Sequence, residues 1–143
     1  MTNTELKKER IIEVLFHFRQ SIYHFTKSES NHFSLSWEDV YLLQILARHD
    51  SLTVTELAEK LKVKNFTASR MISRLAAQNL VQREPSLDDR RVVKVSVTPQ
   101  GKKKLQAIED FNYNALVANF NSLKEEDIQT LMDSLKKMDI LLG

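Results

Sequence analysis

The sequence predicts a mainly α-helical fold with one small β-hairpin. Its 143 residues suit a single domain, 1–143, and a hydrophobic share of 42% is enough to build a buried core. Only two glycines and two prolines interrupt the chain, which favours long helices and few loops. One segment, VVKVSV at 92–97, alternates apolar and polar residues, and this alternation indicates a half-buried strand.

Residues 4–27 are predicted to form a long amphipathic helix. Its apolar residues recur at spacings of four, three, four and three, as in a heptad repeat: Ile11, Leu15, Phe18, Ile22 and Phe25. A second apolar set widens this surface, made of Ile12, Phe16 and Tyr23. We expect the surface to be a dimer seam, and packing within a monomer is the alternative.

Two helices with capping patterns follow a polar segment, 28–35, that is expected to form a loop. Ser36 to Asp39 predicts the start of a helix over 37–49, with the Ser hydroxyl accepting from the Asp39 amide and Asp39 reaching back. Its expected buried residues are Trp37, Val40, Tyr41, Leu43 and either Ile45 or Leu46. After a connector at 50–52, Thr53 to Glu56 opens a helix that ends near 61, with Leu57, Ala58 and Leu61 facing inward.

A tight turn at 62–64 leads to a helix over 65–78, with four apolar anchors: Phe66, Met71, Ile72 and Leu75. Asn79 follows at a position where a helix ends in the left-handed conformation.

Strands at 80–84 and 92–97 flank a charged loop and predict a hairpin with a basic tip. Thr98 as a cap and Pro99 in the first helical position begin a helix to about 121, and a terminal amphipathic helix follows from Leu123.

Helix, short turn, helix and hairpin in this order are typical of a winged helix-turn-helix. Residues 60–104 hold 12 basic and three acidic residues, a net charge of +9, whereas the rest of the chain carries −7. No Asp or Glu occurs from Lys60 to Arg83. A basic segment in an otherwise acidic chain indicates a surface that binds a polyanion, and an ordinary solvated surface is the alternative.

Double-stranded DNA is the polyanion that this arrangement favours, because its major groove admits one α-helix. The hairpin tip can place a cation over the narrow minor groove, with Asp89 holding Arg91 extended. The candidate DNA-binding residues are Lys64, Asn65, Thr67, Ser69, Arg70, Ser73, Arg74, Asp89, Arg90 and Arg91. A winged helix that binds proteins instead of DNA is the alternative from a different class.

Enzymatic chemistry is not indicated, and we expect no catalytic residue, no metal and no cofactor. The absence of cysteine excludes disulfides, CxxC zinc sites and thiol redox sensing. Two glycines cannot form a Gly-rich phosphate loop. His17 and His24 share a helix face and leave open half a metal site with Glu13 or Glu29. No apolar stretch approaches the ~20 residues that cross a bilayer, so we expect a cytoplasmic protein without a membrane partner.

Ordered marks run through Leu52–Leu105: Leu57-Ala58, Thr67, Ser69-Arg70, Arg74-Leu75, Leu80-Val81 with Arg83, Asp89-x-Arg91, and Thr98 with Gly101. In this spacing the segment resembles the MarR family of bacterial regulators. The resemblance implies that the helix at 65–78 enters the major groove and that Arg91 enters the minor groove, oriented by Asp89. It also implies that a DNA-binding lobe of about 36–98 is flanked by dimerisation helices at about 4–27 and 99–142.

The expected partners follow from the same resemblance: a homodimer, a roughly palindromic DNA operator, and a small aromatic or anionic effector whose binding releases a repressor. The predicted dimerisation residues are Ile11, Leu15, Phe18, Ile22, Leu131, Leu135 and Met138. The predicted effector-binding residues are Phe16, Tyr23, Trp37 and Tyr41, and core packing is the alternative for these aromatic side chains.

Overall fold

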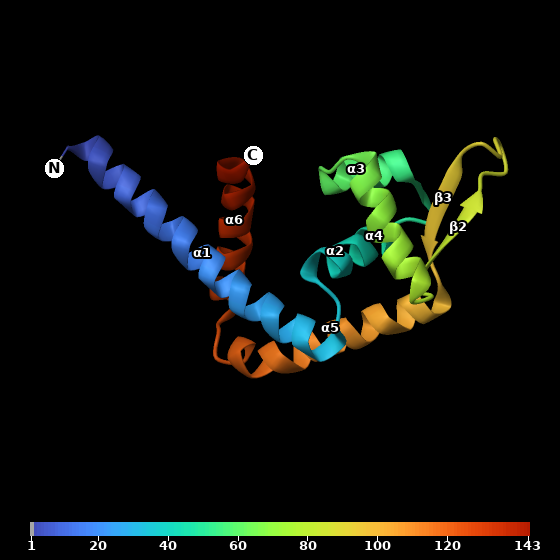
Figure 1. The fold of residues 1–143 in the computed structure, drawn as a ribbon. Coiled ribbons are helices and arrows are strands. Elements are labelled where there is room, and N and C mark those ends of the chain that lie inside the picture. Colours follow the sequence, from blue (N-terminus) through green and yellow to red (C-terminus); the bar gives the residue numbers. More distant parts are fainter. Residues whose placement is uncertain (1) are drawn as a thin grey trace. The chain divides into compact units, whose positions relative to one another are not determined.

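The computed structural model describes residues 2–143 and confirms the mainly helical prediction (Figure 1). In chain order the elements are α1 (Asn3–Phe33), α2 (Trp37–Ala47), β1 (Leu52–Thr53), α3 (Val54–Leu61), α4 (Asn65–Ala77), β2 (Val81–Pro85), β3 (Val93–Val97), α5 (Pro99–Phe120) and α6 (Glu125–Leu142). The chain divides into two compact units, one up to Ile108 and one over Glu109–Gly143. The first unit contains every element from α1 to β3 and the start of α5.

Helix α1 is longer than predicted, and the expected loop at 28–35 was wrong. The helix continues to Phe33 and ends at Ser34, which has a left-handed backbone with φ 55° and donates its N–H to the Ser30 carbonyl at 2.9 Å. Leu35 is buried and Phe33 packs against the core. The Lys104 ammonium lies 5.7 Å from the centroid of the Phe33 ring. Packing of Phe33 and Leu35 therefore extends the helix through residues with weak helix propensity.

Helix α2 begins as predicted, since the Ser36 hydroxyl accepts a hydrogen bond from the Asp39 N–H at 3.1 Å. Its buried face is formed by Val40, Leu42, Leu43 and Leu46. The predicted burial of Trp37 and Tyr41 was wrong, because about half of each side chain is exposed. These two residues are four apart and share the helix face opposite the core.

The three strands form one antiparallel sheet in the order β1-β3-β2. The predicted hairpin is present, with Val81 opposite Val97 and Arg83 opposite Val95. Strand β1 was predicted as part of a connector, because two residues are too few to show an alternating pattern. It pairs Leu52 with Val95 and thereby ties the start of α3 to the sheet.

The core of the first unit lies where α2, α3 and α4 meet the sheet. Its fully buried side chains include Leu43, Leu57, Ile72 and Val95. Met71 and Leu75 are also buried, as predicted for α4. The prediction for the fourth anchor, Phe66, was wrong, because 71% of this residue is exposed. Helix α4 therefore turns one large apolar side chain away from the core.

The second unit contains the end of α5 and helix α6. No residue of α6 is buried. The helix begins after Lys124, whose backbone N–H donates to the Asp127 carboxylate at 3.0 Å. A lysine side chain has no acceptor for the first helical amides, so Asp127 supplies the polar contact at this helix start.

A close backbone approach joins the end of α4 to the start of α5. Asn79 adopts the predicted left-handed conformation with φ 60°, and its carbonyl accepts a hydrogen bond from the Thr98 hydroxyl. Thr98 also accepts from the Gly101 N–H at 2.9 Å, which confirms it as the cap of α5. A methyl group on Gly101 would overlap the Leu80 carbonyl oxygen and lie 2.7 Å from Val97 Cγ1.

We predict that Gly101→Ala destabilises the protein by about 1–3 kcal/mol, because the added methyl group must displace backbone and a buried valine. Urea unfolding measures this loss. Gln100→Ala, which changes the exposed neighbour in the same helix turn, serves as the control. A Gly101→Ala protein as stable as the wild type would contradict the close packing of α5 on Leu80.

The start of α3 carries a reciprocal cap. The Thr53 N–H donates to the Glu56 carboxylate at 3.1 Å, and the Glu56 N–H donates to the Thr53 hydroxyl at 3.1 Å. Two hydrogen bonds to the Glu56 carboxylate lower its pKa from the usual value. The bond from the Thr53 backbone has the larger effect, and the bond from the Thr53 side chain has the smaller one. A lowered pKa means that the ionised carboxylate stabilises the folded state at neutral pH. This contribution is lost as the pH falls through the folded-state pKa.

Glu56→Gln is therefore expected to lower the urea midpoint at neutral pH, with the gap to the wild type closing as the pH falls below the usual glutamate pKa of about 4.3. Glu59→Gln removes the same charge from the same helix and controls for the change in net charge. A gap that stays constant over this pH range would rule out the proposed role of the ionised Glu56 carboxylate.

Candidate nucleic-acid interface

Helices α3 and α4 form the predicted helix-turn-helix. Lys62 ends α3 in a left-handed conformation with φ 56°, and α4 begins three residues later at Asn65. The Asn65 side-chain amide donates to the Thr55 hydroxyl at 3.1 Å and links the two helix starts. Lys64 stands at the N-cap of α4, and its side chain accepts no hydrogen bond from the first amides of the helix.

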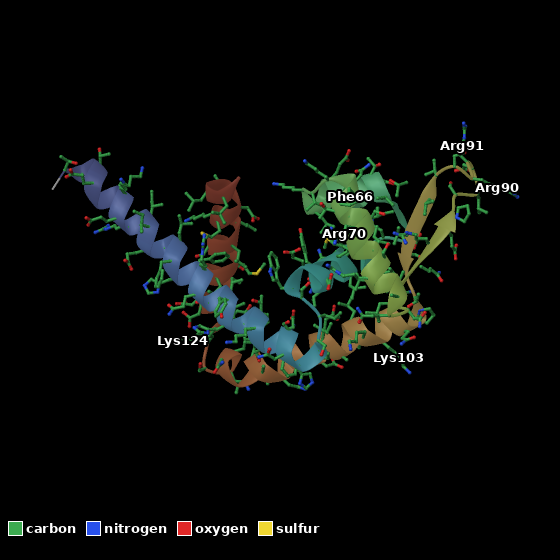
Figure 2. All side chains as sticks on the ribbon, in the orientation of Figure 1. Phe66, Arg70, Arg90, Arg91, Lys103 and Lys124 are labelled. Atoms are coloured by element: carbon green, nitrogen blue, oxygen red, sulfur yellow. The ribbon has the colours of Figure 1, made fainter. Side chains whose placement is uncertain are left out.

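One side of α4 is buried and the other is open. Ala68, Met71, Ile72 and Leu75 face the core. At ~100° per residue, the opposite side is formed by Phe66, Ser69, Arg70 and Ser73. Figure 2 shows Phe66 and Arg70 on α4, where the Arg70 guanidinium carbon lies 5.6 Å from the centroid of the Phe66 ring. The open side therefore combines a cation with an aromatic ring.

Two residues predicted to contact DNA already bind Arg83 of strand β2. One Arg83 guanidinium nitrogen donates to the Ser69 carbonyl at 3.0 Å and to the Ser73 hydroxyl at 2.9 Å. These hydrogen bonds tie the hairpin to α4. Arg83, which stands opposite Val95 in the hairpin, was absent from the predicted site residues.

Arg74 also has a partner inside the protein. Its guanidinium donates to the Asp39 carboxylate at 3.0 Å, and the Asp39 side chain is only 10% exposed. The prediction that Asp39 reaches back to the start of α2 was wrong, because its carboxylate turns to Arg74 instead. The ion pair fixes α4 against α2.

The hairpin tip holds the contact that was predicted between Asp89 and Arg91. One oxygen of the Asp89 carboxylate accepts the Arg91 backbone N–H at 3.0 Å and the Arg91 Nε–H at 3.3 Å. The Arg91 side chain is nevertheless 92% exposed. Within the loop, Ser86 is buried and donates its N–H to the Val92 carbonyl at 2.7 Å. Figure 2 shows Arg90 and Arg91 at the end of the hairpin.

The basic segment found in the sequence does not form one face. Lys103 and Lys104 line a surface hollow of about 420 Å³ with Gln78, the C-cap residue of α4. They thus lie at the end of α4 opposite Phe66, and Figure 2 shows Lys103 far from the labelled residues of α4. Arg70 on α4 and Arg90 and Arg91 at the hairpin tip lie away from Lys103 in Figure 2.

Neither a group of metal ligands nor a membrane-spanning helix is found within residues 2–143. His17 lies 3.5 Å from the Glu13 carboxylate, but no group of three or more potential metal ligands occurs in this part of the chain. No helix among the described residues is both long and apolar enough to cross a membrane.

Comparison with known proteins gives a consistent result. A model of the MarR family matches residues 35–93. An HTH-type transcriptional repressor of Bacillus subtilis, MdtR, is 36% identical over 69 residues, which cover 48% of this chain and 44% of the repressor. The chain therefore spans less than half of that relative's length in the match.

Solved structures share the fold over nearly the whole chain. A MarR family protein from Bacillus stearothermophilus has a TM-score of 0.80 at 18% identity and covers 99% of each chain. A point mutant of MepR from S. aureus, solved bound to an oligodeoxyribonucleotide, has a TM-score of 0.65 at 21% identity. It covers 91% of this chain and 98% of the mutant. The family model thus identifies residues 35–93, which hold the helix-turn-helix and most of the hairpin, as similar to the MarR family, the related repressor matches about half of this chain, and the solved structures share its winged helix-turn-helix fold.

Proposed function

We propose that the protein regulates transcription by binding double-stranded DNA in a sequence-specific manner. The surface formed by the open side of α4 and the hairpin tip carries this proposal, because it presents cations and hydrogen-bonding groups and α4 contains no acid. The oligodeoxyribonucleotide bound by the MepR mutant and the repressor name of MdtR support it.

In the proposed complex α4 lies in the major groove. Arg70 is exposed and is the arginine of α4 whose side chain has no carboxylate partner in the described residues, so it is placed to read a guanine. Lys64, Asn65 and Thr67 lie at the start of α4 and contact phosphates, where a helix N-terminus attracts anions. Ser69 and Ser73 act indirectly, since they hold Arg83.

The hairpin tip forms the second contact. Arg91 reaches into the minor groove, whose negative potential is strongest where it is narrow. Asp89 limits the conformations of Arg91 before binding, and this lowers the entropy lost on binding. Arg90 contacts the adjacent phosphates.

We further propose that the protein is a homodimer that binds a roughly palindromic operator. Apolar side chains of α1 and α6 support this assignment, because Leu15, Phe18, Ile22, Leu131 and Leu135 are exposed in the single chain. Ile11 and Met138 are half-buried. Exposed apolar surface of this extent in a monomer marks a site of association.

The regulator is proposed to be a repressor that a small aromatic or anionic effector releases from DNA. The name of MdtR supports repression. Phe16 and Tyr23 on α1 and Trp37 and Tyr41 on α2 are exposed, so their rings remain available to a ligand. None of the four belongs to the buried core of the single chain.

Arg91→Ala is expected to weaken duplex binding by about 1.5–3 kcal/mol, the usual range for a hydrogen bond to a charged group. Fluorescence anisotropy at several salt concentrations measures the affinity, and log K should fall by about 0.9 for each neutralised phosphate in a plot against log salt. Lys103 lies on α5 beside Gln78, the C-cap residue of α4. Lys103→Ala removes the same charge there and should have little effect. Equal losses in both variants would reject the specific role of Arg91, and the absence of salt-dependent duplex binding would favour a protein-binding winged helix instead.

Leu135→Asp is expected to convert dimers into monomers, because it places a carboxylate in the predicted seam of α6. Ile140→Asp puts the same charge on the opposite face of α6 and serves as the control. Sedimentation equilibrium distinguishes the two species. A Leu135→Asp protein that stays dimeric, or a monomeric wild type, would reject the seam.

A further inference from the structure

The exposure of Phe66 is a feature of the candidate interface that the packing of the fold does not explain. This residue stands in the first turn of α4, opposite the buried Leu75, and 71% of it is exposed. The packing of α4 does not require this ring, because Ala68, Met71, Ile72 and Leu75 already fill the buried face. An exposed phenyl ring among polar residues is costly to hydrate, and covering it with a partner releases this cost.

The ring lies beside a cation that is proposed to read a base. Phe66 and Arg70 are four residues apart, so they are neighbours on the same helix face. The guanidinium carbon of Arg70 lies 5.6 Å from the ring centroid, within the range of a cation–π contact. Arg74 and Arg83, by contrast, are held by Asp39 and by the two serines. Phe66 thus limits the conformations of the Arg70 side chain, and both side chains face the same binding partner.

The chemistry of the major groove leaves one apolar target for this ring. A phenyl group neither donates nor accepts a conventional hydrogen bond, so it cannot pair with the polar edges of guanine, adenine or cytosine. The C5-methyl group of thymine is the apolar feature that bases present in the major groove, and phenylalanine contacts it in protein–DNA complexes.

We propose that Phe66 reads the methyl group of a thymine next to the base that Arg70 contacts. This inference rests on the proposed DNA-binding function and adds a specificity-determining residue to it. In each half-site the ring favours a thymine at one position, and the guanidinium stacked on it reads the neighbouring base pair. Burial of one methyl group changes an equilibrium constant by about fourfold, which is the preference expected per half-site.

The test begins with selection of bound duplexes from a random-sequence library by the wild-type protein. Each thymine of the selected site is then replaced by deoxyuridine, which removes the methyl group and leaves every hydrogen-bonding atom in place. One replacement in a single half-site is expected to weaken wild-type binding about fourfold, and one in each half-site about sixteenfold. Phe66→Ala should bind the thymine and deoxyuridine duplexes with equal affinity, and Phe66→Leu should retain part of the preference.

Lys64→Ala is the matched control, because it changes the residue before α4 and removes a proposed phosphate contact. It should weaken both duplexes equally and keep the fourfold ratio. Since the Phe66 ring is mostly exposed, Phe66→Ala should keep the thermal unfolding midpoint of the wild type, and Phe66→Leu gives a second measurement.

Two results would overturn the inference. One is wild-type binding that no deoxyuridine replacement affects. The other is a Phe66→Ala protein that keeps the preference for thymine, since the methyl group would then contact another residue. In both cases salt-dependent binding to the selected duplex would still support the proposed function. If the wild type selects no duplex at all, the DNA-binding function fails and the role of Phe66 fails with it.

Discussion

Packing of α4 against the core of the first unit is the contact on which the candidate interface depends. Ala68, Ile72 and Leu75 are fully buried, and this fixes both the axis of the helix and its rotation about that axis. A helix can offer a defined set of side chains to a groove only when its other side is held in this way. Substitutions that loosen this packing would therefore disturb every residue on the open side together.

Polar contacts divide the arginines of this region into two groups. Arg74 binds Asp39 and Arg83 binds Ser69 and Ser73, so both connect α4 to other elements of the fold. Arg70 and Arg91 remain directed outward, one stacked on Phe66 and the other held by Asp89. Composition alone treats these four residues as equivalent positive charges. Their partners give each of them a different task.

Much of the fold could be predicted because local signals agree with the tertiary structure. Ser36, Thr53 and Thr98 cap the helices that they were expected to cap, and Asn79 is left-handed as predicted. The contact between Asp89 and Arg91 was also predictable, since the two residues are close in sequence. Such features depend on a few neighbouring residues and can be read without knowledge of the packing.

The wrong predictions concern features that depend on contacts between residues far apart in the sequence. Helix α1 continues to Phe33 because the core accepts Phe33 and Leu35, which the polar neighbours conceal in the sequence. Trp37, Tyr41 and Phe66 were assigned to the core on hydrophobicity, although their helix faces point away from it. Arg83 was missed because its partners lie 10 and 14 residues earlier in the chain.

The uncapped start of α4 has a consequence for how binding and order are related. No side-chain oxygen of Lys64 satisfies the first amides of this helix, and they lie in the same turn as Phe66. An oxyanion that bound there would accept from these amides and lie at the positive end of the helix dipole. Fraying of the first turn of α4 and anion binding to its amides are then thermodynamically linked. Any anion that binds there raises the local stability of the turn by the same free energy that an ordered turn adds to affinity.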